Sequence, residues 1–160
     1  MTPDGAISAH QGMLTSWDPI GFFDGRFLAH GAFIDRQKQI RRRFFADISA
    51  NASDNQTVIT EAFTFDDGET EQRIWVIKKN VDGSYIANTD DVAGHAYGEV
   101  NGPVFKMRYD FFLTMFGRRV KVRFNDIMVR QTDTTILNRA KVSKFGLLLG
   151  ELVITFTKAG

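Results

Sequence analysis

The sequence predicts an all-β fold: an antiparallel up-and-down β-barrel of about 8–10 strands with a short N-terminal helix. Three turn pairs, Asp67-Gly68, Asp82-Gly83 and Asn101-Gly102, separate stretches rich in Val, Ile, Thr, Phe and Tyr. Such pairs readily adopt the positive φ of tight hairpins, so the flanking strands should pair directly. The 15 Phe residues among 160 indicate a wide aromatic interior, which suits a closed sheet. A sandwich is the alternative.

Length and composition predict one soluble domain, with an arm over residues 1–24 and a barrel over 25–160. The absence of Cys excludes disulfides, thiol nucleophiles, thiolate metal sites and an acylated N-terminal Cys. No apolar run approaches the roughly 20 residues of a membrane span, and the first 25 residues lack the pattern of a signal segment. We therefore expect a cytoplasmic protein.

Charge gives no reason to expect a nucleic-acid partner. Lys and Arg total 20 against 19 acidic residues, a net charge of +1. Basic runs occur at 41–43 and 118–123, but on a strand only alternate members share a face. A solvated outer wall that discourages edge pairing explains them more simply.

The first predicted element is a brief helix that ends near Phe23. Ser16 or Asp18 can cap it, and Pro19 suits its first turn.

Period-2 alternation begins at Gly25 and defines about ten strands. The clearest is 104–116, where Phe105, Met107 and Tyr109 alternate with charged residues. An open sheet of this many strands would leave two exposed edges, so closure is expected. The remaining predicted strands cover 25–35, 40–50, 56–66, 70–80, 84–91, 95–101, 118–126, 134–142 and a last segment around 152–156.

Five motifs carry a resemblance to a known family: EAFTFDDGE at 61–69, RIW at 73–75, DDVAG at 90–94, NRA at 138–140 and SKFG at 143–146. In this order they resemble the DUF3833 family of bacterial proteins, over roughly residues 23 to 158. The resemblance implies a lipocalin-like barrel and no known function. It also implies a possible place in the cell envelope, because many members look lipid-anchored, although this chain lacks both the Cys and the signal segment.

Glu61 shares its alternation with apolar residues, so we expect a carboxylate inside the barrel. Burial disfavours the charged form unless a cation or hydrogen-bond donors compensate. A three-residue loop with Gly68 in the left-handed position would place Glu61 opposite Arg73, whereas a two-residue loop would place it opposite Ile74. We favour the first register. The pair is then either a structural ion pair or part of a ligand site.

Either Asn138 or Arg139, but not both, should point inward. An inward Arg139 near a barrel end could stack on Trp17, which would be the closing interaction of lipocalin-like barrels. Lys144 could reach across an open mouth, but a solvated loop lysine is the simpler expectation.

No metal or cofactor is expected. His10, His30 and His95 are too dispersed for a metal site, and His30 should be exposed. Asp90, Asp91 and Asp126 could do acid–base work only if they converge, which their spacing does not establish.

We therefore predict that a small apolar or amphipathic ligand binds in the barrel. The rivals are an enzyme that uses an interior carboxylate on a lipid-like substrate, and an interaction module with a filled core. The expected ligand contacts are Glu61, Arg73, Trp75, Tyr109, Phe111, Asn138 and Arg139. Further lining is expected from Phe44, Phe63, Phe65, Phe105 and Phe124.

Overall fold

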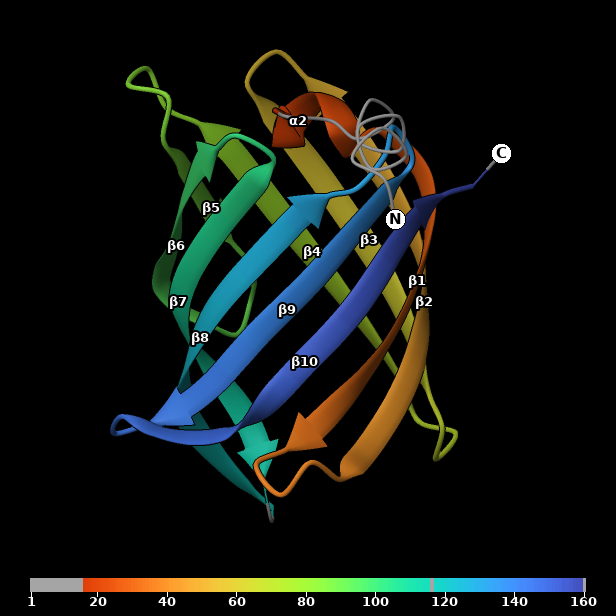
Figure 1. Ribbon diagram of the computed structural model, residues 1–160, viewed down its shortest axis with the longest axis vertical. Coiled ribbons are helices and arrows are strands. Elements are labelled where there is room, and N and C mark those ends of the chain that lie inside the picture. The colour runs from red at the N-terminus through yellow and green to blue at the C-terminus, as the bar shows by residue number, and fades with distance from the viewer. Residues whose placement is uncertain (1–15, 116, 160) are drawn as a thin grey trace, which may run out of the picture.

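Ten antiparallel strands form a closed barrel, and a short helix sits at one of its ends (Figure 1). The computed structural model describes residues 16–115 and 117–159. The elements are α2 (Pro19–Phe22), β1 (Gly25–Asp35), β2 (Ile40–Ser53), β3 (Gln56–Phe65), β4 (Thr70–Lys79), β5 (Tyr85–Asn88), β6 (Val92–Asn101), β7 (Val104–Met115), β8 (Arg118–Arg130), β9 (Thr135–Lys144) and β10 (Leu147–Lys158).

Each strand pairs with its neighbour in sequence, and β1 pairs with β10 to complete the ring. The closing ladder runs from Phe27 opposite Lys158 to Asp35 opposite Gly150. Closure removes the exposed sheet edges that an open meander would carry. The structure thus confirms the predicted up-and-down barrel, and it rules out the sandwich.

The turns follow the predicted chemistry. Gly68, Gly83 and Gly102 have φ of 87°, 90° and 60°, values that a residue without Cβ adopts at little cost. Strand ends were less predictable. Strand β6 begins at Val92 instead of 95 because irregular pairing between Ala93 and Tyr97 interrupts its alternation.

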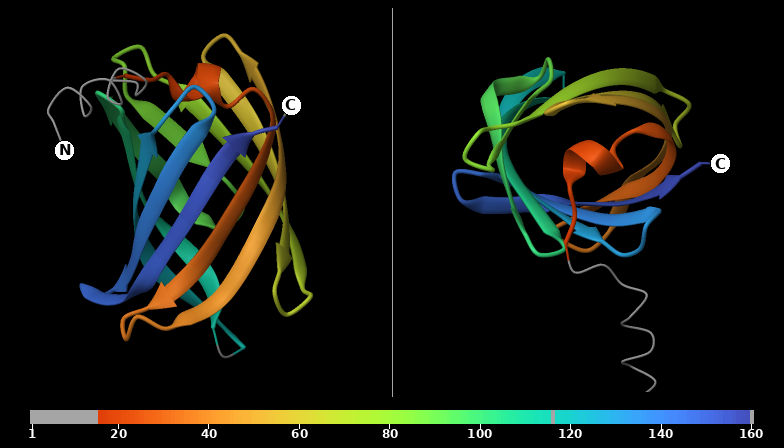
Figure 2. Two further views of the ribbon diagram at one scale, coloured as in Figure 1. Left: turned by 45° about the vertical axis from the view of Figure 1, so that its right-hand side comes forward. Right: turned by 90° about the horizontal axis from the view of Figure 1, so that it is seen from above.

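Helix α2 closes one end of the barrel, and seen from above it lies within the ring of strands (Figure 2). The Asp18 side chain caps it by accepting a hydrogen bond from the Ile20 amide at 3.1 Å. Trp17 packs edge-on against Phe22 and Phe105, with ring centroids 5.7 Å apart in each case. The predicted helix and its cap are confirmed, and residues 1–15 of the predicted arm lie outside the described residues.

Burial differs between the two halves of the interior. Near α2, Phe27, Phe105 and Ile136 are fully buried. Toward the opposite end, which we call the mouth, several inward-facing apolar side chains are only half-buried, Phe44 and Leu113 among them, whereas Phe111, Val122 and Val142 stay buried. The mouth is formed by the turns β1–β2, β3–β4, β5–β6, β7–β8 and β9–β10.

Gly31 lets an aromatic ring cross the inner wall in the mouth half. A Cβ on Gly31 would lie 2.5 Å from Cζ of Phe44 and 2.8 Å from the carbonyl oxygen of Val153. The glycine therefore makes room for the Phe44 ring over a neighbouring strand.

Within residues 16–115 and 117–159, no helix combines the length and apolar character needed to cross a membrane.

Candidate functional site

Polar side chains from five strands, β3, β4, β7, β8 and β9, lie inside the barrel. Glu61 on β3 lies opposite Arg73 on β4, the register expected from a three-residue loop with Gly68 in the left-handed position. Glu61 is 8% exposed and alternates with Ile59 and Phe63, which also face inward. The carboxyl group is therefore inside, as predicted.

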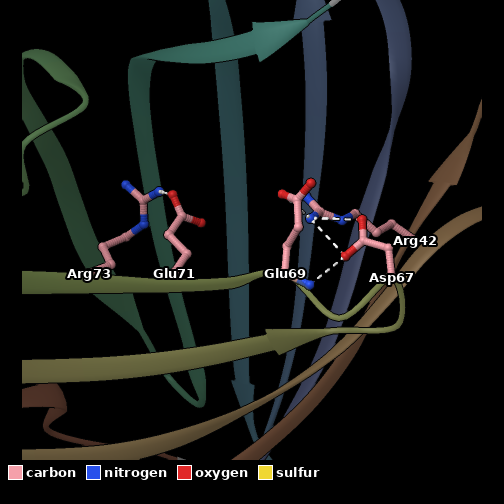
Figure 3. Close-up of polar contacts among 5 residues, drawn as sticks. All are labelled: Arg42, Asp67, Glu69, Glu71 and Arg73. Atoms are coloured by element: carbon pink, nitrogen blue, oxygen red, sulfur yellow. Dashed lines mark hydrogen bonds and ion pairs between the residues drawn. The ribbon is translucent and has the colours of Figure 1, made fainter.

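Arg73 does not form the expected ion pair with Glu61. Its guanidinium contacts Glu71 at 3.0 Å and Asp91 at 3.3 Å, and Figure 3 shows it beside Glu71 on the same strand. It also lies over the Phe111 ring at 4.7 Å. Two carboxylates nearer the mouth compete for this one cation, so the register prediction is right and the predicted contact is wrong.

Asp126 on β8 is the second interior carboxylate, 7% exposed. It accepts hydrogen bonds from the Asn138 side-chain amide and, at 3.5 Å, from the Tyr109 hydroxyl. Asn138 also donates to the Ile127 carbonyl at 3.1 Å. These contacts join β7, β8 and β9 in one buried polar network.

The two carboxylates lie on opposite walls. Strands β4 to β7 separate β3 from β8 on one side of the ring, and β2, β1, β10 and β9 separate them on the other. Among the described residues, no hydrogen bond or ion pair is formed by the Glu61 carboxylate, whereas Asp126 has two donors. Glu61 is thus the unpartnered member of the pair.

Burial raises the pKa of both groups. The pKa of Glu61 rises to about 7, chiefly through desolvation, against which the positive charge of Arg73 acts only partly. The pKa of Asp126 rises to about 6 through desolvation, opposed by its bonds from Asn138 and Tyr109. Desolvation, followed by the Asp126 charge, also raises the pKa of Tyr109 well above its usual value.

Aromatic rings surround the polar groups. Trp75 packs edge-on against Tyr109 with centroids 5.4 Å apart, and Tyr109 stacks on Phe124 at 5.2 Å. Phe111 meets Phe124 edge-on at 5.3 Å. The predicted lining residues Trp75, Tyr109, Phe111 and Phe124 therefore do come together.

Arg139 points outward, which corrects its predicted place among the ligand contacts. It forms a two-pronged ion pair with Glu151 at 2.8 and 3.0 Å and is solvent-exposed. Asn138 takes the inward position, so one of the pair faces in, as expected. Trp17 contacts aromatic rings instead of Arg139. Two cations lie at the closed end, Arg130 and Lys158, 5.2 and 5.0 Å from the centre of the Phe22 ring.

Ion pairs line the mouth. Arg42 bonds Asp67 at 3.1 Å and Glu69 at 3.2 Å (Figure 3), and its guanidinium lies 3.6 Å from the centre of the Phe65 ring. Lys144 donates to the carbonyl oxygen of Lys121 at 2.9 Å, so it neither crosses the mouth nor stays free in solvent.

The wall is incomplete beside the short strand β5. Strand β4 pairs with β5 only from Val76 to Lys79, and the Arg73–Asp91 ion pair links β4 to the β5–β6 turn beyond that ladder. A surface depression of about 520 Å³ lies at this gap. It is lined by Gln72, Ile74, Val76, Asn88, Thr89 and Asp90.

Asp126 was considered for acid–base work but was not among the expected ligand contacts, and Glu71 was in neither group. Asp126 continues the alternation of Val122 and Phe124, and this signal could have identified it. Asp90 and Asp91 do not converge with it, because Asp91 lies at the mouth with Arg73.

His30 is exposed as expected, and His10 lies outside the described residues. No cluster of three metal-ligating side chains occurs in the described part of the chain.

Comparison with solved structures found two similar barrels. An S-type phycobiliprotein lyase, CPES, from Guillardia theta aligns with a TM-score of 0.63 and 10% sequence identity, covering 88% of this chain and 90% of that one. A redesigned β-barrel, mFAP0, bound to DFHBI, aligns with a TM-score of 0.46 and 11% identity over 86% of this chain and 99% of the other. At such identities the likeness to the lyase concerns the fold alone.

Comparison with curated proteins found no match. The family model described as "Protein of unknown function (DUF3833)" matches residues 4–158. This match spans nearly the whole chain and extends the resemblance seen in the sequence motifs. The chain belongs to the DUF3833 family.

Proposed function

We propose that this protein binds a small apolar or amphipathic molecule inside the barrel and that the molecule enters through the mouth. The observation that carries the proposal is the unequal burial of inward-facing side chains. A solid interior packs its apolar groups densely along its whole length. Here most inward-facing apolar side chains of the half nearest α2 are buried, whereas several in the mouth half, mainly on β1, β2, β3 and β10, keep part of their surface exposed. These include Phe33, Phe44, Phe63, Leu113, Leu152 and Ile154.

The proposed site combines an apolar wall with a few polar groups, as small-molecule sites usually do. Trp75, Tyr109 and Phe111 supply the wall, and Glu61 and Asn138 the polar contacts. Arg73 marks the inner limit of the mouth, held by its two carboxylates. The depression on the outer wall is open to solvent, and we assign the ligand to the interior because the unpartnered carboxylate lies there.

Fold analogy gives only general support. The lyase from Guillardia theta acts, by its name, on phycobiliproteins, and its barrel covers most of this chain. Barrels of this kind host unrelated functions, so the ligand must be argued from the residues of this chain.

The proposal is tested by ligand uptake. Native mass spectrometry after gentle purification should detect a bound small molecule, and titration with an apolar fluorophore should saturate. The chain has two Trp residues, so Trp17→Phe leaves Trp75 as the only indole. Its emission should change on uptake, whereas in the matched variant Trp75→Phe the emission of Trp17, in the closed half, should stay constant.

A ligand-free mass together with no fluorophore uptake would overturn the proposal and favour an interaction module with a filled core. A signal that follows Trp17 instead of Trp75 would place the ligand at the closed end and contradict the assigned site.

A second candidate is acid–base catalysis on a lipid-like substrate. The observation that favours it is the pair of facing carboxylates with pKa values raised to about 7 and about 6, because such pairs can supply an acid and a base near neutral pH. Incubating the protein with its co-purified ligand distinguishes the two functions. A mass change in the ligand that Glu61→Gln abolishes indicates an enzyme, and an unchanged ligand indicates binding alone.

A further inference from the structure

We infer that the barrel interior selects an apolar amine, a hydrocarbon chain or ring system with a positively charged hydrogen-bond donor as its head, and that Glu61 receives this head group. The inference rests on the proposed binding function and names the ligand class for the same site. A fatty acid, whose head is an anion, should bind more weakly than an amine of equal length.

The first argument is that Glu61 is the interior charge that lacks a partner. Asp126 accepts bonds from Tyr109 and Asn138. Arg73 is held by its two ion pairs at the mouth. Glu61 is more than nine-tenths buried and forms no hydrogen bond or ion pair within the described residues. A buried carboxylate without donors is costly, and a donor that arrives with the ligand removes that cost.

The second argument is the sign of the charge around Glu61. Its charged neighbours are Asp126 across the interior, Glu71 and Arg73. Three carboxylates therefore face one guanidinium, which is already shared by Glu71 and Asp91. An anionic head would be repelled by this surplus, and it would find no free cation among the described interior groups. A cationic head is attracted by it.

The third argument is the aromatic wall. Trp75 lies opposite Ile59, two residues from Glu61, and packs against Tyr109 at 5.4 Å. Aromatic faces attract cations, most strongly where water is excluded. A desolvated ammonium beside Glu61 would thus gain both a counter-ion and ring contacts. The raised pKa of Glu61, about 7, agrees with a carboxyl group that lacks such a counter-ion in the free protein.

The test compares three ligands of equal chain length: dodecylamine, dodecanol and dodecanoate. Each displaces a bound apolar fluorophore from the full chain near neutral pH, where the amine is protonated and the acid ionised. We expect the amine to bind at least about tenfold more tightly than the acid, with the alcohol between them.

Two variants test whether the preference for the amine depends on Glu61. Glu61→Gln should weaken amine binding by about tenfold, leave the alcohol within about twofold, and remove the preference for amine over acid. Glu99→Gln is the matched control, because Glu99 is exposed on the outer wall of β6 and its loss changes net charge by the same amount. It should leave all three affinities unchanged.

A readout on the unmodified chain covers the case in which Glu61→Gln fails to fold. The pKa of the Glu61 carboxyl, followed by carbon-13 NMR, should fall when dodecylamine binds, because a neighbouring cation favours the ionised form. It should not fall when dodecanol binds.

The outcomes separate the two proposals. Absence of uptake for the fluorophore and all three ligands would overturn the binding function itself. Equal or tighter binding of dodecanoate, or an amine preference that survives Glu61→Gln, would leave binding in place and overturn the assignment of an amine.

Discussion

Glu61 is a carboxyl group inside the barrel with 8% exposure, and the protein supplies it with no donor among the described residues. Burial of a charge is normally offset by pairing or by neutralisation. Because Arg73 is turned toward the mouth, the Glu61 carboxylate loses its charge in the free protein by taking up a proton. With its pKa raised to about 7, Glu61 has a substantial population of the neutral form near neutral pH.

This environment makes stability depend on pH. The pKa of the Glu61 carboxyl rises from an ordinary value of 4.5 to about 7 in the folded protein, so between these values the native state holds a proton that the unfolded chain releases. The free energy of unfolding should therefore fall as the pH rises through this range, by at most about 3 kcal/mol. The charged and titratable groups that set the size of the effect are Glu71, Arg73, Tyr109 and Asp126.

Urea denaturation at a series of pH values checks this prediction. Glu61→Gln should unfold like the unmodified chain near pH 4.5 and be more stable by about 1–3 kcal/mol near pH 8. A smaller dependence below about pH 6 should remain in the variant, because Asp126 also has a raised pKa. A variant less stable than the unmodified chain near pH 8 would indicate a partner for the carboxylate and contradict the account.

Sequence alone could place Glu61 inside the barrel but could not show that Arg73 pairs with other carboxylates. Alternation along a strand fixes which side a residue faces, so the inward carboxyl group was predictable. The direction taken by Arg73 depends on Glu71 and on Asp91, which is distant in sequence, and neither strand pattern carries that information. Asp126 was within reach of the same alternation argument that identified Glu61. Asn138 and Arg139 could not be separated, because both phases of their strand contain apolar residues.

At the scale of elements, the strands depend on glycine where large rings cross the inner wall. Gly31 of β1 lies opposite Phe44 of β2, and its missing side chain leaves space for the ring. Gly98 is related in the same way to Phe105, whose ring atoms would lie 2.6 and 2.9 Å from an added Cβ. Glycine weakens a strand because it is conformationally free, but at these two positions it allows an aromatic ring of the neighbouring strand to pack closely.

Gly31→Ala should destabilise the barrel by about 1–3 kcal/mol, because the new methyl group would overlap both the Phe44 ring and the Val153 carbonyl. Phe44→Leu combined with it should recover only part of the loss, since the carbonyl is backbone and stays in place. A double-mutant cycle from chemical denaturation measures the coupling. Strict additivity of the two substitutions would contradict a crossing of the ring over Gly31.

The sequence predicted which strands exist better than it predicted where each strand ends. Turn pairs and alternation identified every strand of the barrel, because each hairpin is local in sequence. The predicted 118–126 strand extends to Arg130 and the predicted 84–91 strand shrinks to Tyr85–Asn88. Those limits are set by pairing partners: β8 follows β7 and β9 along their full ladders, whereas β5 lies beside an irregular β6.

On the scale of the whole molecule, the barrel has two unlike ends. Aromatic packing around α2 fills one of them, and ion pairs border the other. The closed end contains side chains that are almost entirely buried, such as Trp17 and Phe22 at 6% and 2% exposure. The open half keeps apolar groups in partial contact with solvent. The molecule therefore leaves part of its apolar interior less densely packed in the half assigned to the ligand.

The two tryptophans test this division. Trp17→Ala should lower the free energy of unfolding by about 3–5 kcal/mol, as expected for a large buried side chain. Trp75→Ala, at a half-buried position, should cost about half as much. Urea unfolding followed by circular dichroism measures both without relying on indole emission. Equal losses would mean that the two halves are packed alike.

The ladder between β1 and β10 also makes a circular permutation of the chain possible. The amide of Ala159 donates to the carbonyl of Arg26 at 2.9 Å, so the last strand finishes beside the point where the first begins. A linker could join residue 159 to the start of α2 at the same end of the barrel, and new ends could be opened in the β1–β2 turn beside Lys38. Such a circular permutant would keep all ten inter-strand ladders, because a ring of strands has no first or last member.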